Sequence, residues 1–187
     1  MALADSRATC ATAIDLGDQA APKGNIHPRP KQALGARLAA GALRHLFALG
    51  ELQDSQGPVL AAARALPGPP SLAVSLTFLP PYDAPGALAL APLAPWPGLP
   101  NASACPPAVD PSSCLGLQVQ DAATGAWWPA EASLSSDGGA LLLSAPGAPS
   151  GARANATSNA WSCWPLVLLR GAQGLVPAYP WRQGLTA

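Results

Sequence analysis

Proline and glycine occur so often in this chain that only one stretch is long enough to predict a helix. The 187 residues include 23 prolines and 18 glycines, and the apolar runs after Gly50 are short and separated by these two residue types. Proline fixes φ and lacks a backbone donor, while glycine costs conformational entropy inside a regular element. The sequence therefore predicts one helix near residues 30–49 and short strands joined by turns beyond it.

The helix is predicted to begin at Pro30, because the missing amide hydrogen of a proline would be unpaired at the first helical position anyway. Gly50 is a suitable C-cap. Side chains that recur at steps of three and four predict one buried stripe of an amphipathic helix. The stripe consists of Leu34, Leu38, Ala42, His45 and Leu49, while Arg37 and Arg44 share another side. His45 is thus expected to be a packed or boundary histidine.

An imidazole lies in the loop before this helix. Residues 10–16 form an apolar run that predicts a buried strand, and Asp15 and Asp18 stand at its end. A polar loop with prolines and a glycine follows, and it contains His27. The predicted order is strand, loop and helix, with the imidazole in the loop.

Residues 58–187 predict an all-β sandwich domain. Two stretches alternate between apolar and polar side chains, as half-buried strands do, and they cover residues 72–78 and 115–120. A turn at residues 122–125 predicts a hairpin, and further strands are expected at residues 140–144 and 159–169. Residues 80–111 follow neither period and predict a Pro/Ala-rich insertion of poor order, while residues 1–9 match no pattern.

Charge and cysteine usage exclude several classes of function. Ten basic and ten acidic residues give a net charge of zero, and lysine occurs only at positions 23 and 31, which argues against nucleic-acid binding. No apolar run is long enough to predict a membrane span, and Met1 to Thr9 is not a signal peptide. The four cysteines and two histidines fit no metal-ligand spacing, so no metal site is expected.

The stretch from Asp15 onward resembles the end of the catalytic domain of sialate O-acetylesterases. An apolar segment with an acidic turn, a loop ending in Ile26-His27-Pro28, and a helix that opens with Lys31-Gln32 and carries Arg37-Leu38 are similar to that family. Weaker similarity continues in residues 127–130 and 160–165. These esterases remove acetyl groups from O-acetylated sialic acids and need no cofactor.

The resemblance implies a fold and an active site. Residues 10–50 would be the last strand, His loop and helix of a flavodoxin-like α/β serine-esterase domain, followed by the sandwich. His27 would be the general base, and a serine in a Gly- and Ser-containing turn upstream would be the nucleophile. No serine of this chain stands in a Gly-x-Ser-x-Gly or Gly-Asp-Ser turn, so the chain is expected to be an N-terminally incomplete, inactive part of the enzyme.

The acid that would orient His27 is not fixed by the sequence. Asp18 is the first candidate and Asp15 the second, since both end the apolar run before the loop. The positions two and three residues before the histidine hold Asn25 and Gly24, so a carboxylate is missing there. Either aspartate can instead be a strand-end residue that shapes the loop through its own backbone hydrogen bonds.

Four tryptophans suggest a second reading of the chain, as a non-catalytic β-sandwich module that binds glycan or a partner domain. Aromatic faces stack on sugar rings, but large aromatics also dominate the cores of such sandwiches. The four residues are Trp127, Trp128, Trp161 and Trp164. The substrate expected from the resemblance is an O-acetylated sialic acid or sialoglycan.

Two sequons and the cysteines favour a lysosomal or secreted parent protein. Asn101 and Asn155 each begin an Asn-Ala-Ser/Thr sequence in a turn-rich segment and are expected to carry glycans. Cys105 and Cys114 enclose a short Pro-rich loop and are expected to form a disulfide in an oxidising compartment.

Overall fold

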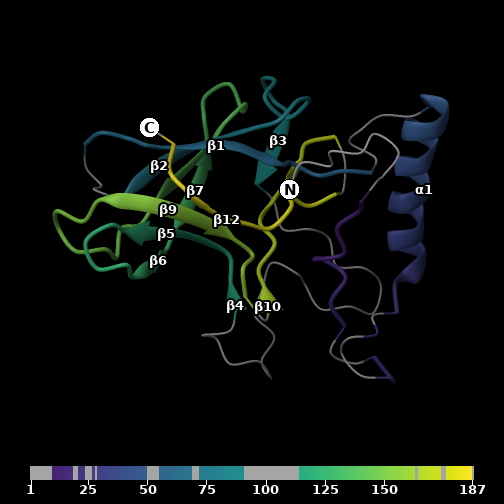
Figure 1. The fold of residues 1–187 in the computed structure, drawn as a ribbon, viewed down its shortest axis with the longest axis horizontal. Coiled ribbons are helices and arrows are strands. Elements are labelled where there is room, and N and C mark those ends of the chain that lie inside the picture. The colour runs from purple at the N-terminus through teal and green to yellow at the C-terminus, as the bar shows by residue number, and fades with distance from the viewer. Residues whose placement is uncertain are drawn as a thin grey trace.

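A computed structural model of the protein describes residues 10–18, 21–23, 27, 29–49, 55–68, 72–90, 114–162, 164–173 and 176–186. These residues contain one helix and twelve strands. Figure 1 shows most of the strands gathered in one body, with helix α1 standing beyond one end of it. The fold is therefore mostly β.

Two four-stranded antiparallel sheets make up the body. The first has the order β1-β2-β8-β7 and the second the order β12-β9-β5-β6. The strands of the first sheet are β1 (Leu60–Ala65), β2 (Ala73–Phe78), β8 (Leu141–Ser144) and β7 (Glu131–Leu134). Those of the second are β12 (Trp181–Gly184), β9 (Ala154–Asn159), β5 (Leu117–Asp121) and β6 (Trp127–Pro129).

Two short pairs complete the sheets. Strand β3 (Leu88–Leu90) runs antiparallel to β11 (Leu169–Gly171), and β4 (Cys114–Leu115) runs parallel to β10 (Trp164–Pro165). Strand β3 lies inside the stretch that was expected to be a poorly ordered insertion, which is therefore not irregular throughout. Residues 91–111 of that stretch lie outside the described residues.

The core lies between the two large sheets. Leu72, Val74, Leu76 and Phe78 are all buried, while Thr77 between them is exposed. This period of two confirms the half-buried strand predicted over residues 72–78. Strands β1 and β2 lie against β9, and β5 lies against β8. The rings of Phe78 and Trp181 meet edge to face across the core, with centroids 5.9 Å apart.

The predicted hairpin is confirmed, since β5 and β6 pair on either side of a turn at residues 122–124. The predicted strand over residues 159–169 is wrong in extent. Strand β9 ends at Asn159, Ala160 has a positive φ of 54°, and the short β10 pairs with β4 instead of continuing β9. The backbone therefore leaves the sheet before Pro165, which cannot donate to a ladder.

The expected end of a flavodoxin-like α/β domain is contradicted. Residues 10–18 contain a turn at residues 14–15 and no strand. Their backbone groups bond locally instead, with Leu16 N–H donating to the Ala13 carbonyl and Ile14 N–H to Thr12 Oγ1. A buried strand needs a neighbouring strand to satisfy its backbone, and this segment pairs with none of the described strands.

Helix α1 (Lys31–Phe47) exists as predicted, but its buried side is not the predicted one. Its buried residues are Ala33, Arg37 and Gly41. Leu38 and Leu49, which were expected inside, are exposed, and so is His45. Pro30 is the N-cap and not the first helical residue, and the C-cap is Ala48 in the left-handed region. Gly50, the predicted cap, lies outside the described residues.

Candidate active site around His27

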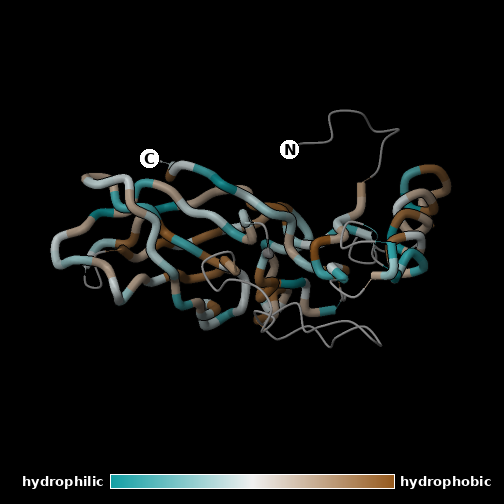
Figure 2. The backbone as a smooth tube through the Cα atoms, turned by 90° about the horizontal axis from the view of Figure 1, so that it is seen from below, coloured by the Kyte–Doolittle hydropathy of each residue, from teal (hydrophilic) through white to brown (hydrophobic). Residues whose placement is uncertain are grey.

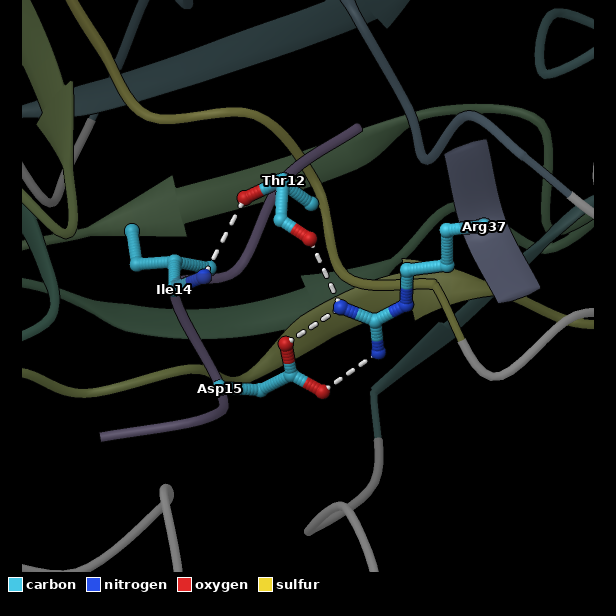
Figure 3. Close-up of polar contacts among 4 residues, drawn as sticks. All are labelled: Thr12, Ile14, Asp15 and Arg37. Carbon is cyan, nitrogen blue, oxygen red and sulfur yellow. Dashed lines mark hydrogen bonds and ion pairs between the residues drawn. The ribbon is translucent and has the colours of Figure 1, made fainter. Parts of the chain in front are cut away.

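Arg37 fixes helix α1 to the segment before it. The guanidinium donates to both carboxylate oxygens of Asp15, at 2.7 and 2.6 Å, and to the Thr12 carbonyl at 2.7 Å (Figure 3). The side chains of Arg37 and Asp15 are only 6% and 3% exposed. Such a bidentate pair is directional as well as strong, so it fixes both the position and the rotation of the helix. This explains why Arg37, and not the predicted leucine stripe, faces inward.

A second aspartate, Asp18, binds the arginine that ends the His27 loop. Arg29 Nε and Nη2 donate to the two carboxylate oxygens at 2.6 and 3.1 Å, and the Arg29 backbone N–H donates to Oδ2 at 3.3 Å. The Asp18 side chain is fully buried, whereas that of Arg29 is 50% exposed. The hydrogen bond to Asp18 and the charge of Asp18 raise the pKa of Arg29 above its ordinary value. Arg29 is therefore the cationic partner of the Asp18 carboxylate.

His27 lies at an exposed position two residues before Arg29. Among the residues that the structure describes, no hydrogen bond joins its imidazole to Asp15 or Asp18. Asn25 and Gly24, which were considered as neighbours of the histidine, lie outside the described residues. Both aspartates that were candidates for the orienting acid are thus bound by arginines, and the role of Asp18 in orienting His27 stays a prediction.

Tyr179 connects this N-terminal segment to the strands. Its hydroxyl donates to the Cys10 carbonyl at 2.9 Å, and its backbone N–H donates to the Pro58 carbonyl at 3.0 Å. Burial, with a smaller contribution from Cys10, raises the pKa of Tyr179, while nearby Arg37 acts in the opposite direction. Residues 10–18 are therefore attached on one side to α1 and on the other to the β-structure.

The tryptophans have separate positions. Trp128 packs against the core, and Trp127 lies half-buried with the Arg182 guanidinium 4.7 Å from its ring centroid. Trp161 is 54% exposed. The side chain of Trp164 lies outside the described residues. Of the three described side chains, Trp128 alone packs against the core and Trp161 is mostly exposed, while the expectation for the whole set of four stays a prediction.

The remaining predicted sites are covered only in part. Asn155 is exposed, but it lies in strand β9 and not in a turn, while Asn101 lies outside the described residues. Cys114 is disulfide-bonded, and Cys10 is a free thiol. Cys105 lies outside the described residues, so its pairing with Cys114 stays a prediction.

Neither a cluster of metal ligands nor a membrane-spanning helix occurs in the described part of the chain. It contains no group of three or more His, Cys, Asp or Glu side chains arranged to hold a metal ion. Nor does it contain a helix long and apolar enough to cross a membrane.

Sequence reasoning missed Arg29 and the inward role of Arg37. A signal was present, because charged residues are scarce in this chain and two arginines follow two aspartates within residues 15–37. What the sequence lacked was the register, that is, which arginine binds which aspartate. The pairing depends on contacts between residues far apart in the sequence, since Arg29 lies 11 positions after Asp18 and Arg37 lies 22 positions after Asp15.

No model of a known protein family matches the chain, and no curated protein sequence matches it. Its fold is similar to that of a solved structure, a novel carbohydrate acetylesterase from Xanthomonas citri, with a TM-score of 0.62 and 22% sequence identity. The match covers 92% of this chain and 32% of the Xanthomonas chain. This chain therefore spans about a third of the length of that enzyme, and at this identity the likeness establishes a shared fold.

Proposed function

We propose that this chain supplies the general-base histidine of a serine esterase that removes acetyl groups from carbohydrates. The observation that carries the proposal is the position of His27, exposed in a loop whose end Arg29 binds to the buried Asp18. The shared fold with a carbohydrate acetylesterase supports the reaction class and the carbohydrate substrate. O-acetylated sialic acids are the substrate that the Ile26-His27-Pro28 block and its helix favour, and a lysosomal or secreted parent protein is part of the same proposal.

The reaction would proceed in two acyl transfers. His27 accepts the proton of a serine hydroxyl, and the serine oxygen attacks the acetyl carbonyl carbon. The bond from that carbon to the sugar oxygen breaks, and the imidazolium gives its proton to the departing sugar oxygen, which leaves as a hydroxyl. His27 then accepts a proton from water, and the water oxygen attacks the acetyl carbonyl carbon. The bond from that carbon to the serine oxygen breaks, the imidazolium returns its proton to the serine oxygen, and acetate leaves. The serine belongs to a segment with a nucleophile turn, which the 187 residues do not contain.

The test is a comparison of the two histidines. In a protein where a nucleophile-bearing esterase segment precedes residue 10, His27→Ala should lower kcat by several orders of magnitude on a chromogenic acetyl ester and on an O-acetylated sialic acid. His45→Ala, at an exposed position on α1, is the matched control and should leave kcat unchanged. If His27→Ala keeps near-full turnover with the fold intact, the general-base assignment is wrong.

A second candidate is sugar binding by the β-structure, which the exposed Trp161 favours. An indole with one face open to water can stack on the apolar side of a pyranose. Titration of the chain with a sialylated trisaccharide should then change the tryptophan fluorescence, and Trp161→Ala should remove the change. An unchanged response in Trp161→Ala would exclude this site.

A further inference from the structure

Asp18 and Arg29 form an ion pair that several hydrogen bonds reinforce. Asp18 accepts three hydrogen bonds from this one residue, two from the guanidinium and one from the backbone N–H. The backbone contact matters most for geometry, because it fixes the course of the main chain at Arg29 as well as its side chain. The buried carboxylate is thus a fixed point to which the end of the loop is attached.

His27 lies very close to this fixed point along the chain. Two peptide units separate it from Arg29, so their Cα atoms are at most about 7.6 Å apart. The ion pair joins residues 11 positions apart, and holding the ends of such a segment together removes conformational freedom from the chain between them, His27 included. A general base must reach the serine hydroxyl within roughly 3 Å, so such freedom would lower the rate.

Asp18 has little capacity left for a direct bond to the imidazole. A carboxylate offers about four lone-pair positions, and Arg29 occupies three of them. The Arg29 cation also compensates the negative charge that a triad aspartate would place beside an imidazolium. An indirect role through Arg29 therefore fits the geometry better than a direct one.

We propose that Arg29 is a positioning residue for His27, and that Asp18 acts on the histidine through Arg29. This inference rests on the proposed function and adds a residue to it. It makes two claims that can be separated, one about the mobility of the loop in this chain and one about turnover in an active esterase.

The first test uses the two lysines of the chain. Lys23 is exposed within the loop, and Lys31 is the first residue of α1, so a lysine-specific protease has one cleavage site in each. Arg29→Gln and Asp18→Asn should each speed cleavage after Lys23 by about tenfold, because opening of the loop becomes easier. Arg64→Gln, which removes an exposed cation from β1, is the matched control and should leave cleavage unchanged. An unchanged rate after Lys23 in Arg29→Gln, or an equal rise after Lys31, would overturn the proposal.

The second test is a double-mutant cycle on kcat in the same active protein as above. Arg29→Gln and Asp18→Asn should each lower kcat on the order of 10- to 100-fold with little change in KM, since the base is misplaced but substrate contacts remain. The double variant should lose no more than either single variant. If Arg29→Gln leaves kcat intact while Asp18→Asn lowers it, Asp18 acts directly and the proposal is wrong. Activity retained in His27→Ala would instead refute the proposed function itself.

Discussion

Asp15 and Arg37 form the ion pair whose loss is expected to lower the stability of the N-terminal segment most. Both side chains of the pair are buried, and the guanidinium also donates a hydrogen bond to the Thr12 carbonyl. Removing one partner leaves the other charge buried and unpaired. Arg37→Ala should therefore lower the free energy of unfolding by about 3–5 kcal/mol, measured by urea denaturation.

The matched control for this prediction is Arg64→Ala, at an exposed position on strand β1. A surface change of this kind should stay within about 0.5 kcal/mol of the parent. If Arg37→Ala and Arg64→Ala cost the same, the Arg37–Asp15 pair does not stabilise the fold.

Asp121 makes part of the stability depend on pH. The Thr124 hydroxyl donates to its carboxylate at 2.7 Å, and the N–H groups of Arg153, Ala123 and Thr124 add three longer bonds. These bonds, the Thr124 hydroxyl first, hold the pKa of Asp121 below its ordinary value, against the effect of burial. A depressed folded-state pKa stabilises the fold above the unfolded value of about 3.9, and this contribution is lost as the pH falls through the folded value.

Asp121→Asn should thus make the melting temperature less sensitive to acid. Thermal unfolding of the parent and the variant between about pH 7 and pH 2 gives the comparison. Asp83→Asn, at an exposed position, serves as the control and should follow the parent. Identical acid sensitivity in Asp121→Asn and the parent would show that the Thr124 turn does not hold the carboxylate in its ionised form.

At the scale of single elements, helix α1 presents an unusual outer face. Leu46 and Phe47 are each 65% exposed, and Leu38, Leu43 and Leu49 are between 42% and 58% exposed. Figure 2 shows hydrophobic residues along this helix, which stands apart from the body of strands. Its inward side instead holds Arg37 between two small residues, Ala33 and Gly41. Exposed apolar side chains close together in the sequence promote dye binding and self-association.

Replacing Leu46 and Phe47 together with glutamine should reduce the binding of a hydrophobic dye and the light scattering at high protein concentration. The melting temperature should change little, because both side chains are mostly exposed. Leu143→Ala gives the opposite pattern as a control, since Leu143 is buried in β8 and its loss should cost about 2–5 kcal/mol. Unchanged dye binding in the double glutamine variant would contradict the claim that Leu46 and Phe47 form an exposed apolar surface.

Strand positions could be predicted from the sequence where the burial pattern is local. Val74 and Leu76 are buried and alternate with neighbours that are half-buried or exposed, and this period of two is visible within seven residues. The orientation of α1 could not be predicted in this way. Its leucine stripe has the period of a buried face, but the buried partner of the helix is the Asp15 carboxylate, which only the folded chain brings to Arg37. The strand predicted from the apolar run over residues 10–16 was wrong for the same reason, because a strand needs hydrogen bonds from a neighbouring strand that the local sequence does not reveal.

At the scale of the whole molecule, two packed sheets carry the N-terminal segment on one edge. Tyr179 precedes β12 and reaches the Cys10 carbonyl, so the segment that leads to His27 is attached to the same body as the core. The Ile26-His27-Pro28 block led to the prediction of a site at His27, which stays a prediction, whereas the arginines that bind Asp15 and Asp18 were not predicted from the sequence.

The sequons test the proposed lumenal or secreted origin. Asn155 is exposed on β9, and its side-chain amide makes only a long contact of 3.4 Å to Gln120 Oε1, so a glycan can be attached without unfolding the strand. Expressed through a secretory pathway behind an added signal peptide, the protein should carry glycans at Asn155 and Asn101. Peptide mapping that finds both asparagines unmodified would remove this support, and Asn155→Gln marks the band shift due to one site.

The most direct measurement isolates proton removal from the serine. A fluorophosphonate reacts covalently with an activated serine hydroxyl, so its labelling rate reports the base without any requirement for sugar recognition. In an esterase that contains this chain, His27→Ala should slow labelling by several orders of magnitude at neutral pH, while His45→Ala should label at the parent rate. Labelling of His27→Ala at the parent rate, with the fold intact, would contradict the assignment of His27 as the general base.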